Sequence, residues 1–277
     1  MRFDRSALDQ SIAARFEQQV HEHSERVAVC DNDHSISYAE LNRYSNRIAH
    51  SLLASIGKDE EPVALLFEQS AASVAATLAA VKAGKIYVPL DPARSRSELG
   101  RVFTDCAPRL IVTQNRHLDL ARSLANGSVQ VHSTDDIDPA TPDRNPGLDK
   151  HPGSQCYIFY TSGTTGTAKG VVDSHRNVLH NVLRYTNSLR ITPDDRLSLI
   201  QSPAFSGTVS SLFSALLNGA TVCPFNLHRF GIGRMGEWIN RQQVTIFHAV
   251  PAIFEQLLSG HRTFPTLRLI RLEGDQT

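Results

Sequence analysis

Apolar residues recur along this chain with two different spacings, which together predict an α/β protein. Helical spacing, with apolar residues three or four positions apart, predicts helices over 6–20, 37–57, 70–83, 98–105, 118–124, 174–189, 210–217, 238–243 and 250–258. Short apolar or β-branched runs predict strands over 27–30, 34–37, 63–67, 86–90, 109–113, 129–132, 157–160, 170–172, 197–201, 220–223, 244–247 and 267–272. Because strands and helices alternate, we expect stacked parallel and mixed β-sheets with flanking helices.

A stretch rich in glycine and hydroxyl groups follows the apolar strand at 157–160. Its candidate ligand-binding residues are Thr161, Ser162, Gly163, Thr164, Thr165, Gly166 and Lys169. Glycines let backbone N–H groups approach an anion, hydroxyls donate to phosphate oxygens, and the lysine adds a positive charge. We interpret this stretch as a phosphate-binding loop rather than an ordinary turn. A Walker A loop ends in Gly-Lys followed directly by Ser or Thr, whereas here Ala168 precedes Lys169 and Gly170 follows it, so the pattern disfavours a kinase or NTPase of that type.

Composition and charge exclude several function classes. The 277 residues carry equal numbers of acidic and basic side chains, which gives no support to nucleic-acid or anionic-membrane binding. No apolar run is long enough for a transmembrane helix. Four dispersed cysteines without a CxxC pair predict reduced thiols in a cytosolic protein. His175 and His180 lack an HExxH setting, so no metal site is expected, and the match of 231–236 to the dinucleotide fingerprint is rejected because no clean strand precedes it.

The phosphate loop resembles the signature of the adenylate-forming superfamily, which includes acyl-CoA synthetases, luciferases and the adenylation domains of nonribosomal peptide synthetases. That signature is Thr-Ser-Gly-Thr-Thr-Gly-x-Pro-Lys-Gly, and the chain departs from it at Ala168, where the family usually has proline. Two earlier stretches, Ile36–Leu41 and Val81–Pro92, resemble the first two core motifs of peptide-synthetase adenylation domains. The Leu90-Asp-Pro92 ending favours that branch over fatty acyl-CoA synthetases.

The resemblance implies a reaction and its cofactors. A carboxylate would attack the α-phosphate of Mg-ATP to give acyl-AMP and pyrophosphate, and the acyl group would then pass to a phosphopantetheine thiol of a carrier protein or to CoA. The phosphate loop would hold the β- and γ-phosphates. Gly274, Asp275 and Gln276 resemble the segment that lies against the adenine and the α-phosphate, although Glu273 replaces the family's first glycine.

The resemblance also places an acyl pocket at Phe205, Ser206, Gly207, Ser210 and His248. Peptide-synthetase domains for α-amino acids carry Phe-Asp-x-Ser there, and the aspartate pairs with the substrate's ammonium group. Ser206 stands at that aspartate position and cannot neutralise an ammonium, so we expect a carboxylic acid without a free α-amine. For His248, a hydrogen-bonded histidine at a strand end is an equally open interpretation.

The resemblance makes 1–277 the N-terminal portion of an adenylation domain, with a first sheet subdomain over about 6–150 and a phosphate-loop and acyl-pocket subdomain over about 151–277. The chain ends before the family's magnesium-binding glutamate and ribose-binding aspartate, and before the C-terminal lid with its catalytic lysine. No catalytic or metal residue is therefore assigned, and the chain is expected to be inactive alone. Two alternatives stay open: an acyl-CoA ligase, and a non-catalytic nucleotide-binding or interaction module.

Overall fold

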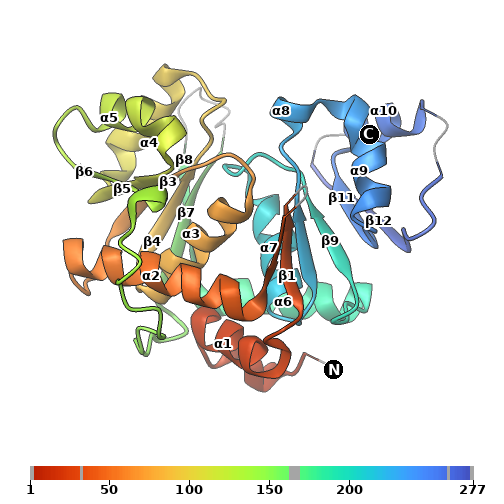
Figure 1. Cartoon of the computed structure of the whole chain (residues 1–277), viewed down its shortest axis with the longest axis horizontal. Coiled ribbons are helices and arrows are strands. Elements are labelled where there is room, and N and C mark those ends of the chain that lie inside the picture. The colour runs from red at the N-terminus through yellow and green to blue at the C-terminus, as the bar shows by residue number, and fades with distance from the viewer. Residues whose placement is uncertain (1–2, 32–33, 162–168, 261–262, 275–277) are drawn as a thin grey trace.

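Two six-stranded sheets form the frame of the protein (Figure 1). The computed structural model describes residues 3–31, 34–161, 169–260 and 263–274. The first sheet has the order β6-β5-β3-β4-β7-β8, and its strands are β3 (Pro62–Leu66), β4 (Ile86–Leu90), β5 (Leu110–Thr113), β6 (Gln130–Ser133), β7 (Gln155–Thr161) and β8 (Lys169–Ser174). The second has the order β12-β11-β9-β10-β1-β2, with β1 (Val27–Asp31), β2 (His34–Ser37), β9 (Arg196–Leu199), β10 (Thr221–Pro224), β11 (Ile246–Ala249) and β12 (Leu269–Leu272).

The strand pairing confirms the fold class expected from the sequence. Within each sheet the neighbouring strands are parallel, except for the antiparallel pairs β1–β2 and β7–β8. Each sheet combines strands from distant parts of the chain. The early hairpin β1–β2 joins the second sheet through the parallel pair Val29 and Val222, and β7–β8 joins the first. The border between the sheets therefore does not coincide with the subdomain boundary near residue 150, which stays a prediction.

The helices follow the apolar spacing of the sequence closely. They are α1 (Ile12–His23), α2 (Tyr38–Ile56), α3 (Ala71–Lys82), α4 (Arg96–Cys106), α5 (Leu118–Ala125), α6 (His175–Leu189), α7 (Gly207–Leu216), α8 (Leu227–Phe230), α9 (Met235–Arg241) and α10 (Pro251–Leu258). The single helix expected over 6–20 is wrong in its first part. A 3-10 turn at Arg5–Leu8 comes first, and α1 begins after Ser11, whose Oγ accepts a hydrogen bond from the N–H of Ala14 at 3.1 Å.

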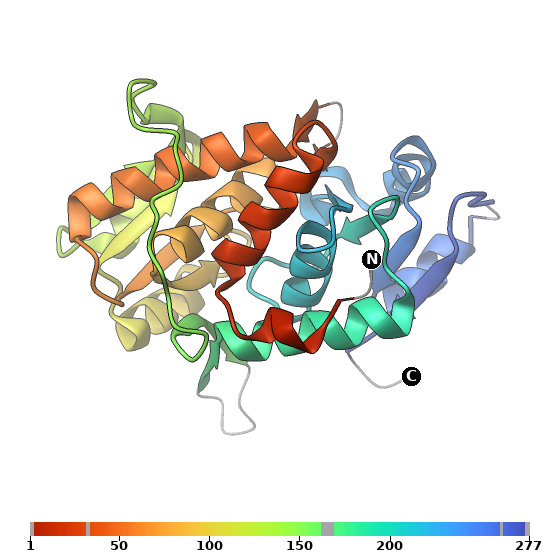
Figure 2. The ribbon, with the colours of Figure 1, turned by 90° about the horizontal axis from the view of Figure 1, so that it is seen from below.

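Apolar clusters cover both faces of the sheets, as parallel sheets require. Between the sheets, α3 and α7 face each other, and Val74 and Val209 line one small cavity there (Figure 1). Leu99 of α4 belongs to the cluster on the outer face of the first sheet, and Trp238 of α9 belongs to the corresponding cluster on the second. Figure 2 shows α1, α2 and α6 from below. The sheets are thus fixed against each other by the central helices.

The second helix begins with a complete capping box, as the sequence predicts. The Oγ of Ser37 accepts from the N–H of Glu40 at 3.2 Å, and the Glu40 carboxylate accepts from the N–H of Ser37 at 2.8 Å. We expect Ser37→Ala to lower the free energy of unfolding by about 1 kcal/mol. Urea denaturation would measure this loss. Ser97→Ala, at an exposed position inside α4, is the matched control and should change stability by less than half as much. Equal losses in the two variants would contradict the capping role.

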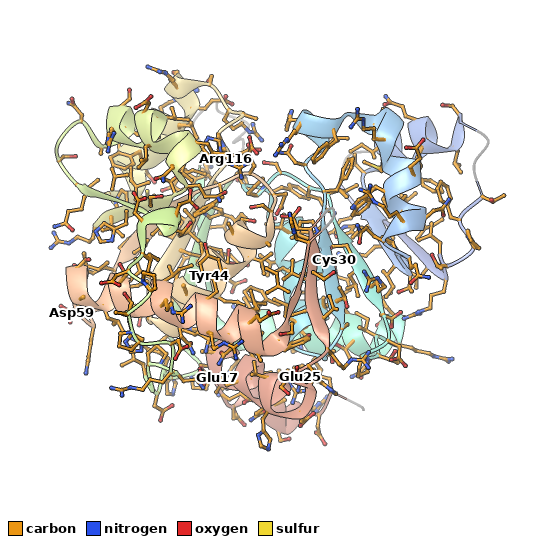
Figure 3. The ribbon with its side chains drawn as sticks, viewed as in Figure 1. Glu17, Glu25, Cys30, Tyr44, Asp59 and Arg116 are labelled. Carbon is orange, nitrogen blue, oxygen red and sulfur yellow. The ribbon has the colours of Figure 1, made fainter. Side chains whose placement is uncertain are left out.

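The four cysteines are buried and free. Figure 3 marks Cys30 on β1, whose thiol donates to Oε1 of Gln242 at 2.6 Å. Residues 231–236 run through short helical segments after α8, without a strand leading into them, so the structure does not give the setting of a dinucleotide fingerprint. Over the described ranges, no helix combines the length and the apolar character needed to span a bilayer.

Candidate active site

The two ends of the predicted phosphate loop are fixed by a β-hairpin. β7 and β8 pair in antiparallel register, and the last pair is Thr161 opposite Lys169. The hydroxyl of Tyr160 donates to Oδ2 of Asp105 at 2.5 Å, which ties the hairpin to α4. Thr161 and Lys169 are both exposed. The hairpin therefore presents a hydroxyl and a cation side by side at the start and end of the loop. The loop residues expected to contact phosphate, namely Ser162, Gly163, Thr164, Thr165 and Gly166, lie outside the described residues.

A pocket of about 430 Å³ brings the hairpin and the predicted acyl motif together. Tyr160 and Thr161 line one side of it, and Phe205 and Ser206 line another. These residues come from different sheets, since Thr161 ends β7 and Phe205 follows β9. An adjoining pocket of about 260 Å³ is lined by residues that follow β4, β9, β10 and β11. Both pockets thus lie at the carboxyl ends of parallel strands, where α/β sheets commonly bind ligands.

The exit from β4 holds the acyl motif in place. The Oγ of Ser202 donates to Oδ2 of Asp91 at 2.5 Å, and the N–H of Ala93 donates to its Oδ1 at 2.9 Å. Asp91 is 3% exposed and is the aspartate of the Leu90-Asp-Pro92 ending. Because Ser202 begins the turn that leads to Phe205, this aspartate connects the first sheet to the acyl motif in the second.

Gly207 allows the Phe205 ring to lie where it does, and Gly274 lies next to the same ring. A Cβ on Gly207 would lie 2.4 Å from Cε1 of Phe205, and one on Gly274 would lie 3.6 Å from its Cζ. Gly274 also has φ +82°, a conformation that L side chains rarely adopt. The turn after β12 therefore packs beside the acyl motif. Asp275 and Gln276, which were expected to contact nucleotide with Gly274, lie outside the described residues.

Ser210 and His248 lie away from the 430 Å³ pocket, although the resemblance grouped them with Ser206. Both are buried, and both line a separate cavity of about 10 Å³ with Tyr185 and Arg271. Ser210 faces α6, since Nδ2 of Asn181 donates to its Oγ at 3.4 Å. The predicted acyl residues thus line two separate cavities, one with Phe205 and Ser206 and the other with Ser210 and His248.

His248 is hydrogen-bonded on both ring nitrogens. Its Nδ1 lies 2.8 Å from Oγ of Ser211, and its Nε2 lies 3.0 Å from Oε2 of Glu273. Burial, with a smaller contribution from Arg271, lowers the pKa of His248 to about 3. The ring is therefore neutral at physiological pH. From these partners we assign the proton to Nε2, which donates to the Glu273 carboxylate, while Nδ1 accepts from the serine.

Arg271 and Glu273 form a charged pair beside His248 that sequence reasoning missed. Arg271 contacts the Glu273 carboxylate and the hydroxyl of Tyr185, and its guanidinium stacks 3.8 Å from the centre of the Tyr185 ring. Burial lowers the pKa of Arg271. The sequence did contain an indication that Arg271 is unusual. Arg271 alternates with the exposed Ile270 and Leu272, so an arginine occupies an inward position of an apolar strand.

Two arginines add positive charge to the 430 Å³ pocket. Arg94 pairs with Glu98 at 3.5 Å, and Glu98 also accepts from the backbone and hydroxyl of Ser95. Arg101 donates to the carbonyl of Ser97, and its side chain forms no ion pair within the described ranges. Arg101 thus offers an uncompensated cation on the wall that faces Thr161.

The histidines do not assemble a metal centre in the part of the chain that the structure describes, where no group of three or more His, Cys, Asp or Glu residues could hold a metal ion. His175 instead has a structural role at the start of α6. Its Nδ1 accepts from the N–H of Ile12 at 3.2 Å, and burial lowers its pKa to about 4. The neutral ring therefore links the N-terminus of α1 to α6.

Comparisons with known proteins identify the family of this chain. Residues 16–275 match the family described as AMP-binding enzyme. Tyrocidine synthase 1 from Brevibacillus parabrevis is 30% identical over 272 residues, which cover 97% of this chain and 24% of the synthase. Surfactin synthase subunit 1 from Bacillus subtilis is 29% identical over 270 residues, which cover 97% of this chain and 8% of the subunit. The chain thus spans at most about a quarter of the length of these curated relatives.

Solved structures show the same fold. The nonribosomal peptide synthetase FmoA3 with bound α-methyl-L-serine-AMP superposes with a TM-score of 0.87 at 25% identity, over 96% of this chain and 30% of FmoA3. ATP-bound MatB from Rhodopseudomonas palustris superposes with a TM-score of 0.84 at 26% identity, over 95% of this chain and 54% of MatB. Since the family match extends over nearly the whole chain and the fold agrees with solved relatives, the chain belongs to the AMP-binding enzyme family.

Proposed function

We propose that this chain takes part in the ATP-dependent activation of a carboxylic acid. One observation carries the proposal: the hairpin end at Thr161 and the acyl motif at Phe205 and Ser206 line the same pocket. A carboxylate oxygen of the acid would form a bond to the α-phosphorus of ATP. The bond between the α-phosphorus and the bridging oxygen would break, giving an acyl adenylate and pyrophosphate.

The described residues supply positive charge and confinement for this step. Lys169, opposite Thr161, and Arg101, on the pocket wall, are placed to neutralise phosphate oxygens as charge develops on pyrophosphate. The likeness to ATP-bound MatB supports ATP as the nucleotide. The described residues contain no set of carboxylates that would hold Mg²⁺, so the proposal includes no step through that ion.

The acyl group would then pass to a phosphopantetheine thiol. The thiolate sulfur would attack the acyl carbon, forming a thioester and releasing AMP. The likeness to peptide synthetases and the Leu90-Asp-Pro92 ending favour a carrier protein as the acceptor over CoA. We also propose that the lid residues absent from these 277 residues are needed for both steps, so that the chain alone does not complete them.

The substrate is proposed to lack a free α-amine, which distinguishes it from the α-methyl-L-serine moiety bound to FmoA3. Ser206 provides no charge for an ammonium group, and the carboxylates around the pocket are already engaged. Asp91 accepts from Ser202, and Glu98 accepts from Arg94 and Ser95. Glu273, behind the acyl motif, pairs with Arg271. An ammonium in this pocket would therefore be desolvated without a counter-ion.

The test is carboxylate-dependent ATP–pyrophosphate exchange, measured on the 277-residue chain and on the longest product of the same reading frame. The acid panel should pair α-amino acids with their deaminated, hydroxy and keto analogues. We expect exchange in the longer product, at least tenfold faster with an acid lacking the amine than with its α-amino counterpart. Ser206→Asp should shift the preference toward the α-amino acid, whereas Ser206→Ala should keep it.

The possible results separate the parts of this proposal. If exchange were fastest with an α-amino acid, the proposed substrate class without a free α-amine would be rejected, but activation of a carboxylic acid would still be supported. Exchange in the 277-residue chain would reject the requirement for the lid. Thioester formation on CoA but not on a carrier protein would support the acyl-CoA ligase alternative. Mg-ATP binding without exchange in either form would support a non-catalytic nucleotide-binding module, and the absence of both would reject the proposed function.

A further inference from the structure

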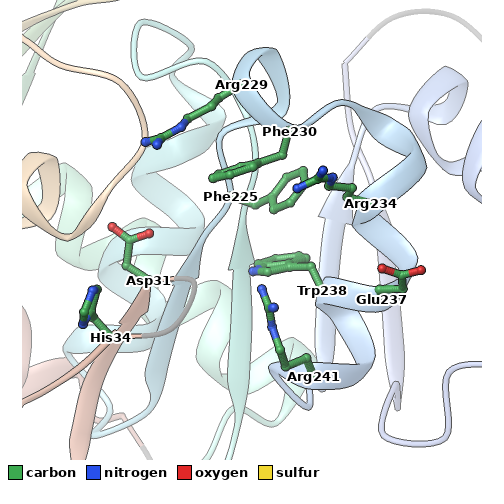
Figure 4. A pocket seen from close by; sticks show the side chains of 9 residues that line it. All are labelled: Asp31, His34, Phe225, Arg229, Phe230, Arg234, Glu237, Trp238 and Arg241. Atoms are coloured by element: carbon green, nitrogen blue, oxygen red, sulfur yellow. The ribbon is translucent and has the colours of Figure 1, made fainter.

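A further cavity lies outside the candidate active site. It has a volume of about 530 Å³ and lies between the β1–β2 edge of the second sheet and the helices α8 and α9 (Figure 4). We call it the arginine–aromatic pocket, and it is lined by Asp31, His34, Phe225, Arg229, Phe230, Arg234, Glu237, Trp238 and Arg241. The volume is sufficient for a small organic ligand.

The inner wall of the arginine–aromatic pocket is aromatic. Phe225 and Trp238 pack with ring centres 4.8 Å apart, and Phe225 and Phe230 pack with ring centres 5.6 Å apart. Phe225 and Trp238 are 2% and 1% exposed, so this wall belongs to the rigid core of the second sheet. Phe230 is only half-buried, so its ring is the part of this wall that a flat apolar ligand can stack against or meet edge to face.

Trp238 also presents an unused hydrogen-bond donor. Its Nε1 is fully buried and has no acceptor in the described part of the chain. Figure 4 shows this nitrogen on the side of the ring that faces Asp31 and His34, across the pocket. A buried indole N–H usually has a partner, because leaving it unpaired costs about 1–3 kcal/mol. A bound acceptor atom would satisfy it.

The rim of the pocket is cationic. Arg229 and Arg234 are exposed, and neither forms an ion pair within the residues that the structure covers. The Arg229 guanidinium lies 5.2 Å from the centre of the Phe230 ring. Of the two carboxylates in the lining, Asp31 accepts from the N–H of Ala71 at 2.8 Å and is therefore engaged at the start of α3. Arg229 and Arg234 therefore present two guanidinium groups at the rim that are not paired with a carboxylate among the described residues.

We propose that the arginine–aromatic pocket binds a small aromatic carboxylate. The ring would lie against the half-buried Phe230, and the carboxylate would accept hydrogen bonds from Nε1 of Trp238 and from Arg229 or Arg234. The pocket is separate from the acyl motif, although Phe225 also lines the 260 Å³ pocket beside it.

The chain provides its own reporter for this site, since Trp238 is its sole tryptophan. The 277-residue chain should be titrated with benzoate while the tryptophan fluorescence is followed, and affinity should be measured independently by calorimetry. We expect saturable binding of benzoate. Benzamide, which has the same shape without the charge, and cyclohexanecarboxylate, which has the charge without the aromatic ring, should each bind at least about tenfold more weakly.

Three variants test the assigned contacts. Arg229→Ala and Arg234→Ala should each weaken benzoate about tenfold, and Trp238→Phe, followed by calorimetry, should do the same because it removes the donor and keeps a ring. Arg43→Ala, an exposed arginine on α2, is the matched control and should have no effect. Circular dichroism would establish that each variant is folded.

Equal affinity for benzoate and benzamide would overturn the proposal, and so would unchanged benzoate affinity in both arginine variants. The second result would place the bound benzoate elsewhere, for example in the 430 Å³ pocket. Absence of saturable binding to the folded chain would overturn it as well. None of these results bears on ATP–pyrophosphate exchange, so the proposed function stands or falls separately.

Discussion

Replacing Lys169 with alanine is expected to slow carboxylate-dependent ATP–pyrophosphate exchange by about 10²- to 10³-fold in the form of the protein that shows exchange. Lys169 stands opposite Thr161 at the end of the β7–β8 hairpin, so its backbone is anchored where the phosphate loop ends. Charge on pyrophosphate rises as the bond to the α-phosphorus breaks, and a fixed cation stabilises that charge more than it stabilises bound ATP. The loss should therefore fall on kcat more than on the KM for ATP.

Lys58→Ala is the control for this prediction, because Lys58 is an exposed lysine in the loop between α2 and β3. It should exchange at the rate of the unmodified protein. Lys169 is exposed, so its replacement should leave the unfolding transition unchanged. A loss of less than about threefold would remove Lys169 from phosphate stabilisation. A loss that appears with a lowered melting temperature would point to a damaged hairpin instead.

Replacing Asp195 with alanine is expected to lower the free energy of unfolding by about 3 kcal/mol. Asp195 is 4% exposed and precedes β9 directly. Its carboxylate accepts two hydrogen bonds of 2.7 Å from Arg268, one of 2.7 Å from Thr245 and one of 2.9 Å from the N–H of Thr192. These partners come from the segments that lead into β9, β11 and β12, so the substitution removes the acceptor that joins the three segments.

Asp194→Ala is the matched control, since Asp194 pairs with Arg26 but its side chain is 87% exposed. It should cost less than about 1 kcal/mol in urea denaturation. If the two variants lost similar amounts of unfolding free energy, burial of Asp195 would not increase its contribution to stability.

The pH dependence of stability gives a second test of the role of Asp195. Burial alone would raise the pKa of Asp195, but the hydrogen bonds from Arg268, Thr245 and Thr192 lower it below the 3.8 of an unperturbed aspartate. The stabilisation is present above that value and is lost as pH falls through the pKa of the folded state. The unmodified chain should therefore lose more stability than Asp195→Ala when pH is lowered below about 4. Equal losses of stability in the unmodified chain and in Asp195→Ala would contradict the assigned pKa shift.

Periodicity was sufficient for the secondary structure. Apolar spacing located the helices and strands, and local chemistry such as the capping box at Ser37 fixed where some of them begin. The helix expected over 6–20 was partly wrong because the Ser11 cap interrupts a continuous apolar stripe. Sheet membership was harder to predict. Pairing of Val29 with Val222 depends on contacts between distant segments, which no local pattern encodes.

The candidate site, too, was predictable from the sequence only in part. The hairpin end at Thr161 and the acyl motif at Phe205 came from sequence motifs, and the structure places them on one pocket. Arg101 carried no motif, because its importance depends on its position across a pocket from another sheet. Likewise, the separation of Ser210 and His248 from Phe205 arises from the orientation of α7, which spacing along the chain did not reveal.

The second sheet combines the early strands β1 and β2 with strands from the end of the chain, and this has a consequence for folding during synthesis. On the ribosome, the β1–β2 hairpin emerges early, yet its parallel neighbour β10 is synthesised roughly 190 residues later, which takes on the order of 10–40 s at common translation rates. During that interval the exposed edge of β1 lacks its partner and is open to wrong pairing. The nascent chain is therefore expected to depend on chaperones most while residues 38–220 are being translated.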